Sequence, residues 1–260
     1  MEMKTIYSTD NKIYKLCKEL TVKKYRDRLA KYIIEGENLV EEAVKSGVSP
    51  EYIIIREDYE GNALRFASAA KENVYFSRQL FAEAAQTETS QGIMAVVGKT
   101  ELAADEFYAR LGSKNILVLD RLQDPGNIGT MLRTAEAAGY GGVIAIKGTG
   151  DIYSPKAVRA AAGSVFRMPV LQGEETSESA RRIKETGRRI AATAMDGAVI
   201  YYEANLKENI ALVIGNEGNG ISDEFLALSD VRVSIPMNGY VESLNAAVAA
   251  AILMYENMRK

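Results

Sequence analysis

The 260-residue chain contains no histidine, no tryptophan and a single cysteine, Cys17. Without imidazole and with only one thiol, the usual zinc sites cannot be assembled from its side chains. The same absence excludes catalytic triads and general bases that depend on histidine. A lone cysteine excludes an internal disulfide and is typical of a reducing cytoplasm. Composition neither indicates nor excludes a carboxylate-bound magnesium ion, so no metal site is predicted.

Long hydrophobic runs are also missing. The longest nearly uncharged apolar stretch, Ala246–Tyr255, is far shorter than the ~20 residues that cross a bilayer. The N-terminal sequence MEMKTIYSTDNKIYK lacks the hydrophobic core of a signal peptide. We therefore expect a cytoplasmic protein with no membrane partner, and its length allows two domains of about 100–150 residues.

The net charge of −3 argues against a protein that coats nucleic acid uniformly, but phosphate binding requires only a local basic patch. Eight basic residues and two acidic ones lie between Asn11 and Tyr32. Taken alone, this cluster is better explained as the solvated face of amphipathic helices. If other features indicate RNA, the candidate RNA-binding residues are Lys12, Lys15, Lys23, Lys24, Arg26 and Arg28.

The first hundred residues have the pattern of a small α/β unit. Hydrophobic spacing predicts helices over Lys12–Leu20, Glu37–Ser46, Ala63–Lys71 and Arg78–Ala85. Short β-rich runs predict strands over Tyr52–Ile55, Val74–Phe76 and Gly92–Val97. An acidic, alanine-bearing stretch follows. We therefore predict one domain over residues 1–99, a linker over 100–112 and a second domain over 113–260.

In the second domain, short apolar runs alternate with helical patterns. The predicted strands are Ile116–Leu119, Val143–Ile146, Arg189–Ala194, Ala211–Ile214 and Val231–Ile235. The predicted helices are Gly126–Gly139, Ser154–Ala162, Ser177–Thr186, Asp223–Ser229 and Ser243–Met258. Such alternation predicts a mostly parallel sheet with helices on both faces. Because ligands bind outside the carboxyl ends of such strands, the informative residues should follow strands directly.

The first strand-end segment reads NILVLDRLQDPGNIGTMLRTAEAAGYGG and places a Pro-Gly turn before a helix. Ile128, Leu132 and Ala135 fall on one face of that helix, and Arg133 points well away from it. Arg133 is either a solvated surface arginine or a guanidinium presented to a phosphate. Asn127, near the helix start, is either a cap or a site residue.

The second segment, LVIGNEGNGIS, lacks the Gly-Lys-Ser/Thr ending of a phosphate loop. Gly215, Gly218 and Gly220 would let backbone approach a ligand closely, with Glu217 among them as a fixed carboxylate. A plain tight turn explains the glycines equally well but explains Glu217 less well. In the third segment, VRVSIPMNGYVESLNAAVAAAILMYENMRK, an apolar stripe from Leu244 to Met258 indicates a core or dimer contact.

Together, the order, strand-end positions and spacing of these segments resemble the signature motifs of the SpoU (TrmH-like) family of RNA ribose 2′-O-methyltransferases, part of the SPOUT superfamily. The resemblance covers about Asn115 to Lys260. The first hundred residues look like the ribosomal-protein-like α/β domain often found upstream, with a role in RNA recognition. The resemblance implies a deep trefoil knot in the parallel sheet, S-adenosyl-L-methionine bound in the knot, a homodimer and a structured RNA substrate.

The resemblance also implies which residues act. The catalytic residues would be Asn127, Arg133, Glu217, Ser243 and Asn245. The S-adenosylmethionine pocket would be formed by Gly215, Ile235 and Leu244, with Leu119, Ile214, Asn216, Glu217, Gly218, Met237, Ser243 and Asn245 as neighbours.

Methyl transfer from a sulfonium is an in-line displacement, so the protein mainly positions the reactants and stabilises charge. Arginine is the base often proposed for the family, but a guanidinium keeps its proton up to pH ~12. We therefore expect Arg133 to hold a phosphate and stabilise the developing alkoxide, while the proton leaves to phosphate or water.

The expected substrate is large-subunit ribosomal RNA, because an N-terminal domain carries the basic stretch; transfer RNA is the alternative. A non-catalytic RNA-binding assembly factor is a further hypothesis, which loss of Asn127, Arg133 or Glu217 would have favoured. A nucleotide-binding enzyme acting on small molecules is disfavoured, because the phosphate-loop lysine and the dinucleotide fingerprint are missing.

Overall fold

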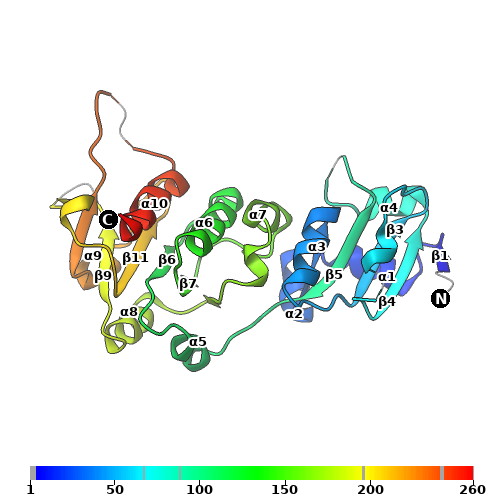
Figure 1. Cartoon of the computed structure of the whole chain (residues 1–260), viewed down its shortest axis with the longest axis horizontal. Coiled ribbons are helices and arrows are strands. Elements are labelled where there is room, and N and C mark those ends of the chain that lie inside the picture. The colour runs from blue at the N-terminus through cyan, green and yellow to red at the C-terminus, as the bar shows by residue number, and fades with distance from the viewer. Residues whose placement is uncertain (1–3, 67, 88, 195–196, 241–242, 260) are drawn as a thin grey trace. The chain divides into compact units, whose positions relative to one another are not determined.

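The computed structural model describes residues 4–66, 68–87, 89–194, 197–240 and 243–259. Contacts divide the chain into two compact units (Figure 1). Unit 1 comprises Met1–Thr100 and Tyr153–Phe166, and unit 2 comprises Glu101–Ile152 and Arg167–Lys260. This division differs from the predicted domains, because one segment flanked by unit 2 strands belongs to unit 1 and most of the predicted linker belongs to unit 2.

Unit 1 contains a five-stranded mixed sheet in the order β1-β4-β3-β5-β2. Both β1 and β3 pair with β4 in parallel, and β5 runs antiparallel to β3 and β2. The strands are β1 (Lys4–Ile6), β2 (Lys31–Glu35), β3 (Tyr52–Arg56), β4 (Glu72–Phe76) and β5 (Ile93–Gly98). The helices are α1 (Lys12–Glu19), α2 (Lys23–Leu29), α3 (Glu37–Lys45), α4 (Arg78–Ala84) and α7 (Pro155–Ala161), with the 3-10 turns η1 (Ala63–Phe66) and η2 (Ser164–Phe166).

One predicted helix of unit 1 is wrong. The sequence indicated a helix over Ala63–Lys71, whose residue 67 lies outside the described residues, but the chain forms only η1 there. The backbone N–H of Ala69 bonds to the Phe66 carbonyl as a turn, and that of Lys71 bonds to the Pro50 carbonyl. The backbone is therefore drawn into the sheet instead of continuing a helix. The strands β1 and β2 and the helix α2 were not predicted, whereas α1, α3 and α4 confirm their predictions.

Unit 2 contains a seven-stranded sheet in the order β10-β12-β9-β11-β6-β7-β8, and every pairing between its strands is parallel. The strands are β6 (Ile116–Asp120), β7 (Gly142–Ala145), β8 (Val170–Gln172), β9 (Arg189–Thr193), β10 (Val199–Ile200), β11 (Ile210–Gly215) and β12 (Val231–Ser234). The helices are α5 (Ala104–Arg110), α6 (Pro125–Ala137), α8 (Thr176–Glu185), α9 (Asp223–Leu228) and α10 (Ala246–Tyr255), with the 3-10 turns η3 (Tyr201–Glu203) and η4 (Glu256–Met258). The α/β class and the parallel sheet are confirmed, β8 and β10 were missed, and the trefoil knot stays a prediction.

Helices cover both faces of this sheet. Alternate strand residues point to opposite faces, and Ile116 and Val118 of β6 join a core with Phe107 of α5, Ile183 of α8 and Phe225 of α9. The other face is covered by α6 and α10, which pack against each other and lie side by side in Figure 1. With both faces covered, the strand ends and their loops are left to form a site. No helix in the described ranges is both long enough and apolar enough to span a membrane.

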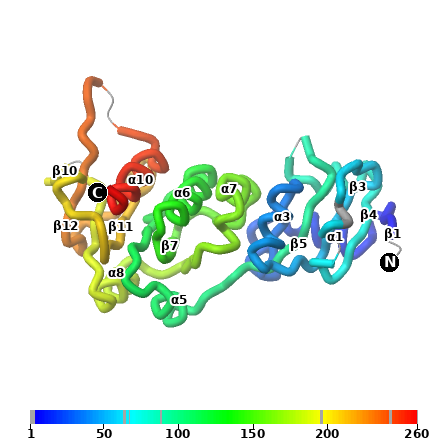
Figure 2. The backbone as a smooth tube through the Cα atoms, viewed as in Figure 1, coloured from blue at the N-terminus to red at the C-terminus, as the bar shows by residue number. Residues whose placement is uncertain are grey.

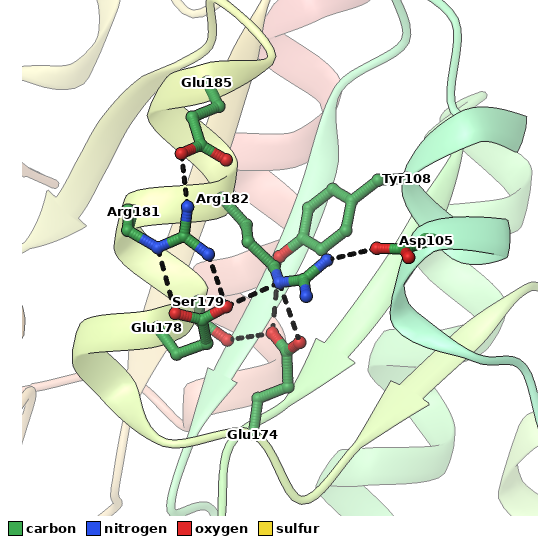
Figure 3. A network of polar contacts seen from close by, with 8 residues as sticks. All are labelled: Asp105, Tyr108, Glu174, Glu178, Ser179, Arg181, Arg182 and Glu185. Atoms are coloured by element: carbon green, nitrogen blue, oxygen red, sulfur yellow. Dashed lines mark hydrogen bonds and ion pairs between the residues drawn. The ribbon is translucent and has the colours of Figure 1, made fainter.

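The segment predicted to be a linker contains a packed helix, α5. Its buried aromatic side chain enters the core described above, and its polar residues contact α8 (Figure 3). Arg182 of α8 donates a hydrogen bond to Asp105 at 2.7 Å, and the Tyr108 hydroxyl donates to Glu174 at 3.4 Å. An acidic, alanine-bearing sequence that looked like a connector is thus held firmly in unit 2.

Candidate functional site

The candidate site begins where β6 and β11 end side by side. Gly215, the last residue of β11, is in register with Asp120, the last residue of β6. After β6 the chain turns through Arg121, whose φ of 58° is left-handed, and enters α6. The side chain of Asp124 caps this helix by accepting a hydrogen bond from the Asn127 N–H at 2.8 Å. Aspartate at the cap followed by proline is a strong helix start, so the residues QDPGN set where α6 begins.

The loop after β11 closes tightly on itself. Asn216 and Gly220 exchange two backbone hydrogen bonds, each 2.9 Å long. A Cβ atom on Gly215 would lie 2.3 Å from backbone atoms of Gly220 and Ile221, whereas one on Gly218 would meet only a side-chain oxygen at 3.6 Å. The loop's own backbone therefore requires glycine at position 215.

Asn216 and Asp120 join the two loops. The Asn216 Oδ1 accepts from two backbone N–H groups of its own loop at 3.0 Å, and its Nδ2 donates to the Arg121 carbonyl at 3.0 Å. The buried carboxylate of Asp120 accepts from the Ser222 N–H at 2.6 Å. Asn216 was predicted to neighbour the cofactor, and in this structure its side chain shapes the loop that would carry a cofactor.

Three of the five predicted catalytic residues are linked by hydrogen bonds. Asn127 Nδ2 donates to Glu217 Oε1 at 3.0 Å, and Asn245 Nδ2 donates to Asn127 Oδ1 at 2.9 Å. Asn245 is also the N-cap of α10, since its Oδ1 accepts from the N–H groups of Ala247 at 2.9 Å and Val248 at 3.2 Å. We call Glu217, Asn127 and Asn245 the amide relay, because two side-chain amides connect a helix end to a carboxylate.

The polarity of the amide relay is set by its two ends. The N-terminus of α10 carries partial positive charge, and its backbone N–H groups donate to the side-chain oxygen of Asn245. The amide nitrogen of Asn245 is therefore left to donate to Asn127. At the other end, Glu217 also accepts from the N–H groups of Gln123 and Asp124, each at 3.3 Å. Partial burial raises the pKa of Glu217, but the hydrogen bonds from Asn127 and from backbone outweigh burial and lower the pKa below its ordinary value. The carboxylate is therefore ionised at neutral pH.

Arg133 and Ser243, the other two predicted catalytic residues, lie apart from the relay. Both are exposed, Arg133 on α6 and Ser243 just before α10. In the part of the chain that the structure describes, neither side chain makes a hydrogen bond or an ion pair. The Arg133 guanidinium is consequently available to a ligand.

Two residues predicted to neighbour the cofactor have buried side chains. Leu119 and Ile214 lie in the central strands β6 and β11, where Leu119 is fully buried and Ile214 almost so. Their side chains pack within the sheet, and contact between these two residues and the cofactor stays a prediction.

The remaining predicted cofactor residues lie between β12 and α10. Ile235 is half-buried, and Met237 and Leu244 are partly exposed. Beyond β12 the chain runs away from the sheet before returning to α10 (Figure 2). Among the described residues, no backbone group of 235–240 makes a backbone–backbone hydrogen bond. Apolar side chains beside backbone groups that pair with no other described backbone group suit an adenosyl group, whose base presents an amino donor and ring-nitrogen acceptors.

Within the described ranges, no group of three or more histidine, cysteine, aspartate or glutamate residues could hold a metal ion.

Most candidate RNA-binding residues of the basic cluster are exposed, but Arg26 is buried. The exposed residues are Lys12, Lys15, Lys23, Lys24 and Arg28. Three of these make surface ion pairs, in which Lys15 pairs with Asp10, Lys23 with Asp27 and Arg28 with Glu19.

The prediction that Arg26 binds RNA is wrong. Its side chain is only 5% exposed, and its guanidinium donates to the Leu20 carbonyl at 2.8 Å. Arg26 thus ties α2 to the end of α1. Residue type and local charge could not reveal this, because the carbonyl that Arg26 contacts is presented only by the folded turn.

Comparisons with known proteins show which family the chain resembles. Residues 114–255 match the SpoU rRNA Methylase family, and residues 11–95 match the MRM3-like substrate binding domain. The chain is 38% identical to the 23S rRNA (guanosine(2553)-2′-O)-methyltransferase RlmP of Bacillus subtilis, over 97% of this chain and 98% of that protein. An AdoMet-bound rRNA methyltransferase from Sinorhizobium meliloti has a TM-score of 0.87 at 28% identity, covering 98% of this chain and 97% of that chain. The SpoU methyltransferase AviRb from Streptomyces viridochromogenes, in complex with AdoMet, has a TM-score of 0.82 at 28% identity, covering 95% and 97% respectively.

Proposed function

The chain belongs to the SpoU family of RNA 2′-O-methyltransferases, and from this premise we propose that it methylates a ribose 2′-hydroxyl of large-subunit ribosomal RNA. S-adenosylmethionine is the methyl donor of this reaction. The observation that carries the proposal is the amide relay, in which Glu217, Asn127 and Asn245 meet beside the ends of β6 and β11. The match of residues 11–95 to a substrate-binding domain supports a large folded RNA as substrate.

The protein's contribution to the reaction is chiefly positioning. When bound, S-adenosylmethionine supplies an electrophilic methyl group on a sulfonium. Ile235, Met237 and Leu244 would contact its adenosyl part, and the loop that starts at Gly215 would hold the rest. The relay keeps this loop, the start of α6 and the start of α10 in one arrangement before a ligand arrives, so little ordering is left for the moment of reaction.

Arg133 acts on the RNA side of the reaction. Its exposed guanidinium has no partner among the described residues, so it can take a phosphate oxygen and stabilise charge that develops on the ribose oxygen. Because a guanidinium stays protonated in proteins, Arg133 is not the base. The hydroxyl proton leaves to phosphate or water.

A homodimer is part of the proposal. On α10, Ala250, Leu253 and Met254 are buried against the sheet and α6, while Val248 is 50% exposed and Tyr255 47% exposed. Single apolar residues on a surface are ordinary, but an apolar stripe along a helix favours a partner surface. A second copy of the chain is the partner that the family resemblance implies.

The proposed function is tested with purified protein, methyl-labelled S-adenosylmethionine and separate transcripts of 23S rRNA, 16S rRNA and transfer RNA. We expect label in the 23S transcript alone, at a ribose that becomes resistant to alkaline cleavage, and no label with the R133A variant. Label confined to transfer RNA would overturn ribosomal RNA as the proposed substrate. Cofactor and RNA binding without label in any RNA would identify a non-catalytic factor instead.

A further inference from the structure

A groove lined by both polar and apolar residues lies in unit 1, and none of the basic residues of α1 and α2 lines it. Its walls are the turn from β2 into α3, the loop that precedes β5 and the end of α7, all within unit 1. We call it the α3–α7 groove. Its volume of about 290 Å³ is at the lower end of the range for ligand pockets. A groove of this volume suits a single nucleotide better than a long ligand.

The floor of the α3–α7 groove is held by internal hydrogen bonds. The carboxylate of Glu35 accepts from the Thr87 hydroxyl and, at 2.7 Å, from the Gln86 N–H. The Gln91 Oε1 accepts from the Glu37 N–H at 3.0 Å at the start of α3. These bonds join two segments of unit 1 that are far apart in sequence, so the groove has a defined shape before any ligand binds.

Its rim carries polar groups that the protein does not use. Asn38, Thr89 and Arg159 line the groove and are exposed, and in the described part of the chain none of these side chains has a hydrogen bond or ion pair. They offer an amide, a hydroxyl and a guanidinium. An amide can read a base edge with a donor and an acceptor at once, and a guanidinium can hold a phosphate.

The charges of the groove distinguish between candidate ligands. Among the described residues that line it, Glu35 and Glu42 are acidic and Arg159 is the one cation, so a free phosphate or polyphosphate would meet more negative than positive charge. A nucleotide within an RNA strand brings one phosphate for Arg159 and a neutral base whose N–H groups suit carboxylate and amide oxygens. Sequence-specific RNA recognition mostly targets such unpaired nucleotides.

We propose that the α3–α7 groove takes one unpaired nucleotide of the RNA substrate, with Arg159 on its phosphate and Asn38 on the edge of its base. The inference rests on the proposed function in so far as the substrate is RNA. In this proposal the groove recognises the RNA sequence, and the exposed lysines of α1 and α2 make non-specific phosphate contacts.

The test compares four variants in binding to the 23S transcript at several salt concentrations. R159Q and N38A change the groove, and K71Q and N62A are matched exposed changes in unit 1 that do not line it. We expect R159Q to weaken binding about tenfold and to flatten the salt dependence by about 0.7 in log–log slope, the value for one phosphate contact on a single strand. N38A should weaken binding about fivefold with the slope unchanged, because a base contact releases no counterion.

Turnover separates recognition from catalysis and from folding. Both groove variants should raise KM for RNA while kcat at saturating RNA, S-adenosylmethionine affinity and the unfolding temperature stay at wild-type values. Wild-type RNA binding by R159Q and N38A, or equal losses in K71Q and N62A, would overturn the groove assignment. If wild-type protein methylates transfer RNA alone, the proposed substrate fails, and the same four variants then test the groove on transfer RNA.

Discussion

Replacing Gly215 by alanine should damage the site through backbone alone. A Cβ there would lie 2.3 Å from the Gly220 carbonyl carbon and the Ile221 nitrogen, and 2.5 Å from the Gly220 oxygen. All three atoms belong to backbone, so no side-chain rotation can relieve the contact, and the loop must open by about 1 Å to reach ordinary van der Waals separation. The two hydrogen bonds between Asn216 and Gly220 lie directly in the path of that movement.

The cost can be bounded in two ways. Overpacking in a closely packed region costs about 1–3 kcal/mol, and opening the loop instead gives up two backbone hydrogen bonds of about 1 kcal/mol each. The smaller of the two costs applies, so G215A should lose about 1–3 kcal/mol of unfolding free energy. The unfolding temperature should fall by about 2–4 °C for each kcal/mol lost. Because Asn216 and Glu217 hold the start of α6, the shift also reaches the relay, and S-adenosylmethionine affinity should fall about tenfold or more.

The assay pairs G215A with G218A. Thermal unfolding without ligand should show a loss for G215A and none for G218A, whose Cβ would meet only Asn216 Oδ1 at 3.6 Å. Calorimetry then measures S-adenosylmethionine binding for both variants. A wild-type unfolding temperature and wild-type affinity for G215A would refute the reasoning. A G218A protein of normal stability that no longer binds the cofactor would place the ligand itself against the backbone at Gly218.

Four further outcomes are expected. R133A should keep its RNA and S-adenosylmethionine affinities while methyl transfer falls by about 10²–10³-fold, and an equal fall in RNA affinity would reduce Arg133 to a docking residue. N245A removes the cap of α10 and should cost about 1 kcal/mol of unfolding free energy by thermal denaturation, so unchanged stability would contradict the relay's structural part. V248D should turn a dimer into a monomer in light scattering at micromolar concentration, and a monomeric wild-type protein would refute the dimer. Burial raises the pKa of Cys17 from 9.0 to about 12, so a thiol reagent should not modify the folded protein at pH 8. Because the pKa of the thiol is higher in the folded protein than in the unfolded chain, burying the neutral thiol leaves stability unaffected below about pH 9 and lowers it as pH rises towards about 12. Rapid labelling of Cys17 in the folded protein would contradict its burial.

Much of unit 2 could be predicted from sequence because its signals are local. The runs at Ile116–Leu119 and Ala211–Ile214 are short, apolar and bounded by turn residues, and β6 and β11 occupy nearly the same residues. Asp124 before proline marks the start of α6 by its own capping chemistry. Elements that owe their existence to contacts were missed. The two-residue strand β10 exists only because β12 pairs with it, and α5 looked like a linker until its aromatic residue met the core.

The candidate site divides in the same way. Glycine at position 215 and a carboxylate two residues later can be read from sequence, since both follow a strand end, and the resemblance then names Asn127 and Asn245 as their companions. Only the tertiary structure decides that Glu217, Asn127 and Asn245 form one hydrogen-bonded chain, that Arg26 is buried, and that Leu119 belongs to the core. The physical reason is that a hydrogen bond depends on position to within a few tenths of an ångström. Residues about 90 positions apart in the chain reach that distance only when the parallel sheet has brought β6 and β11 together.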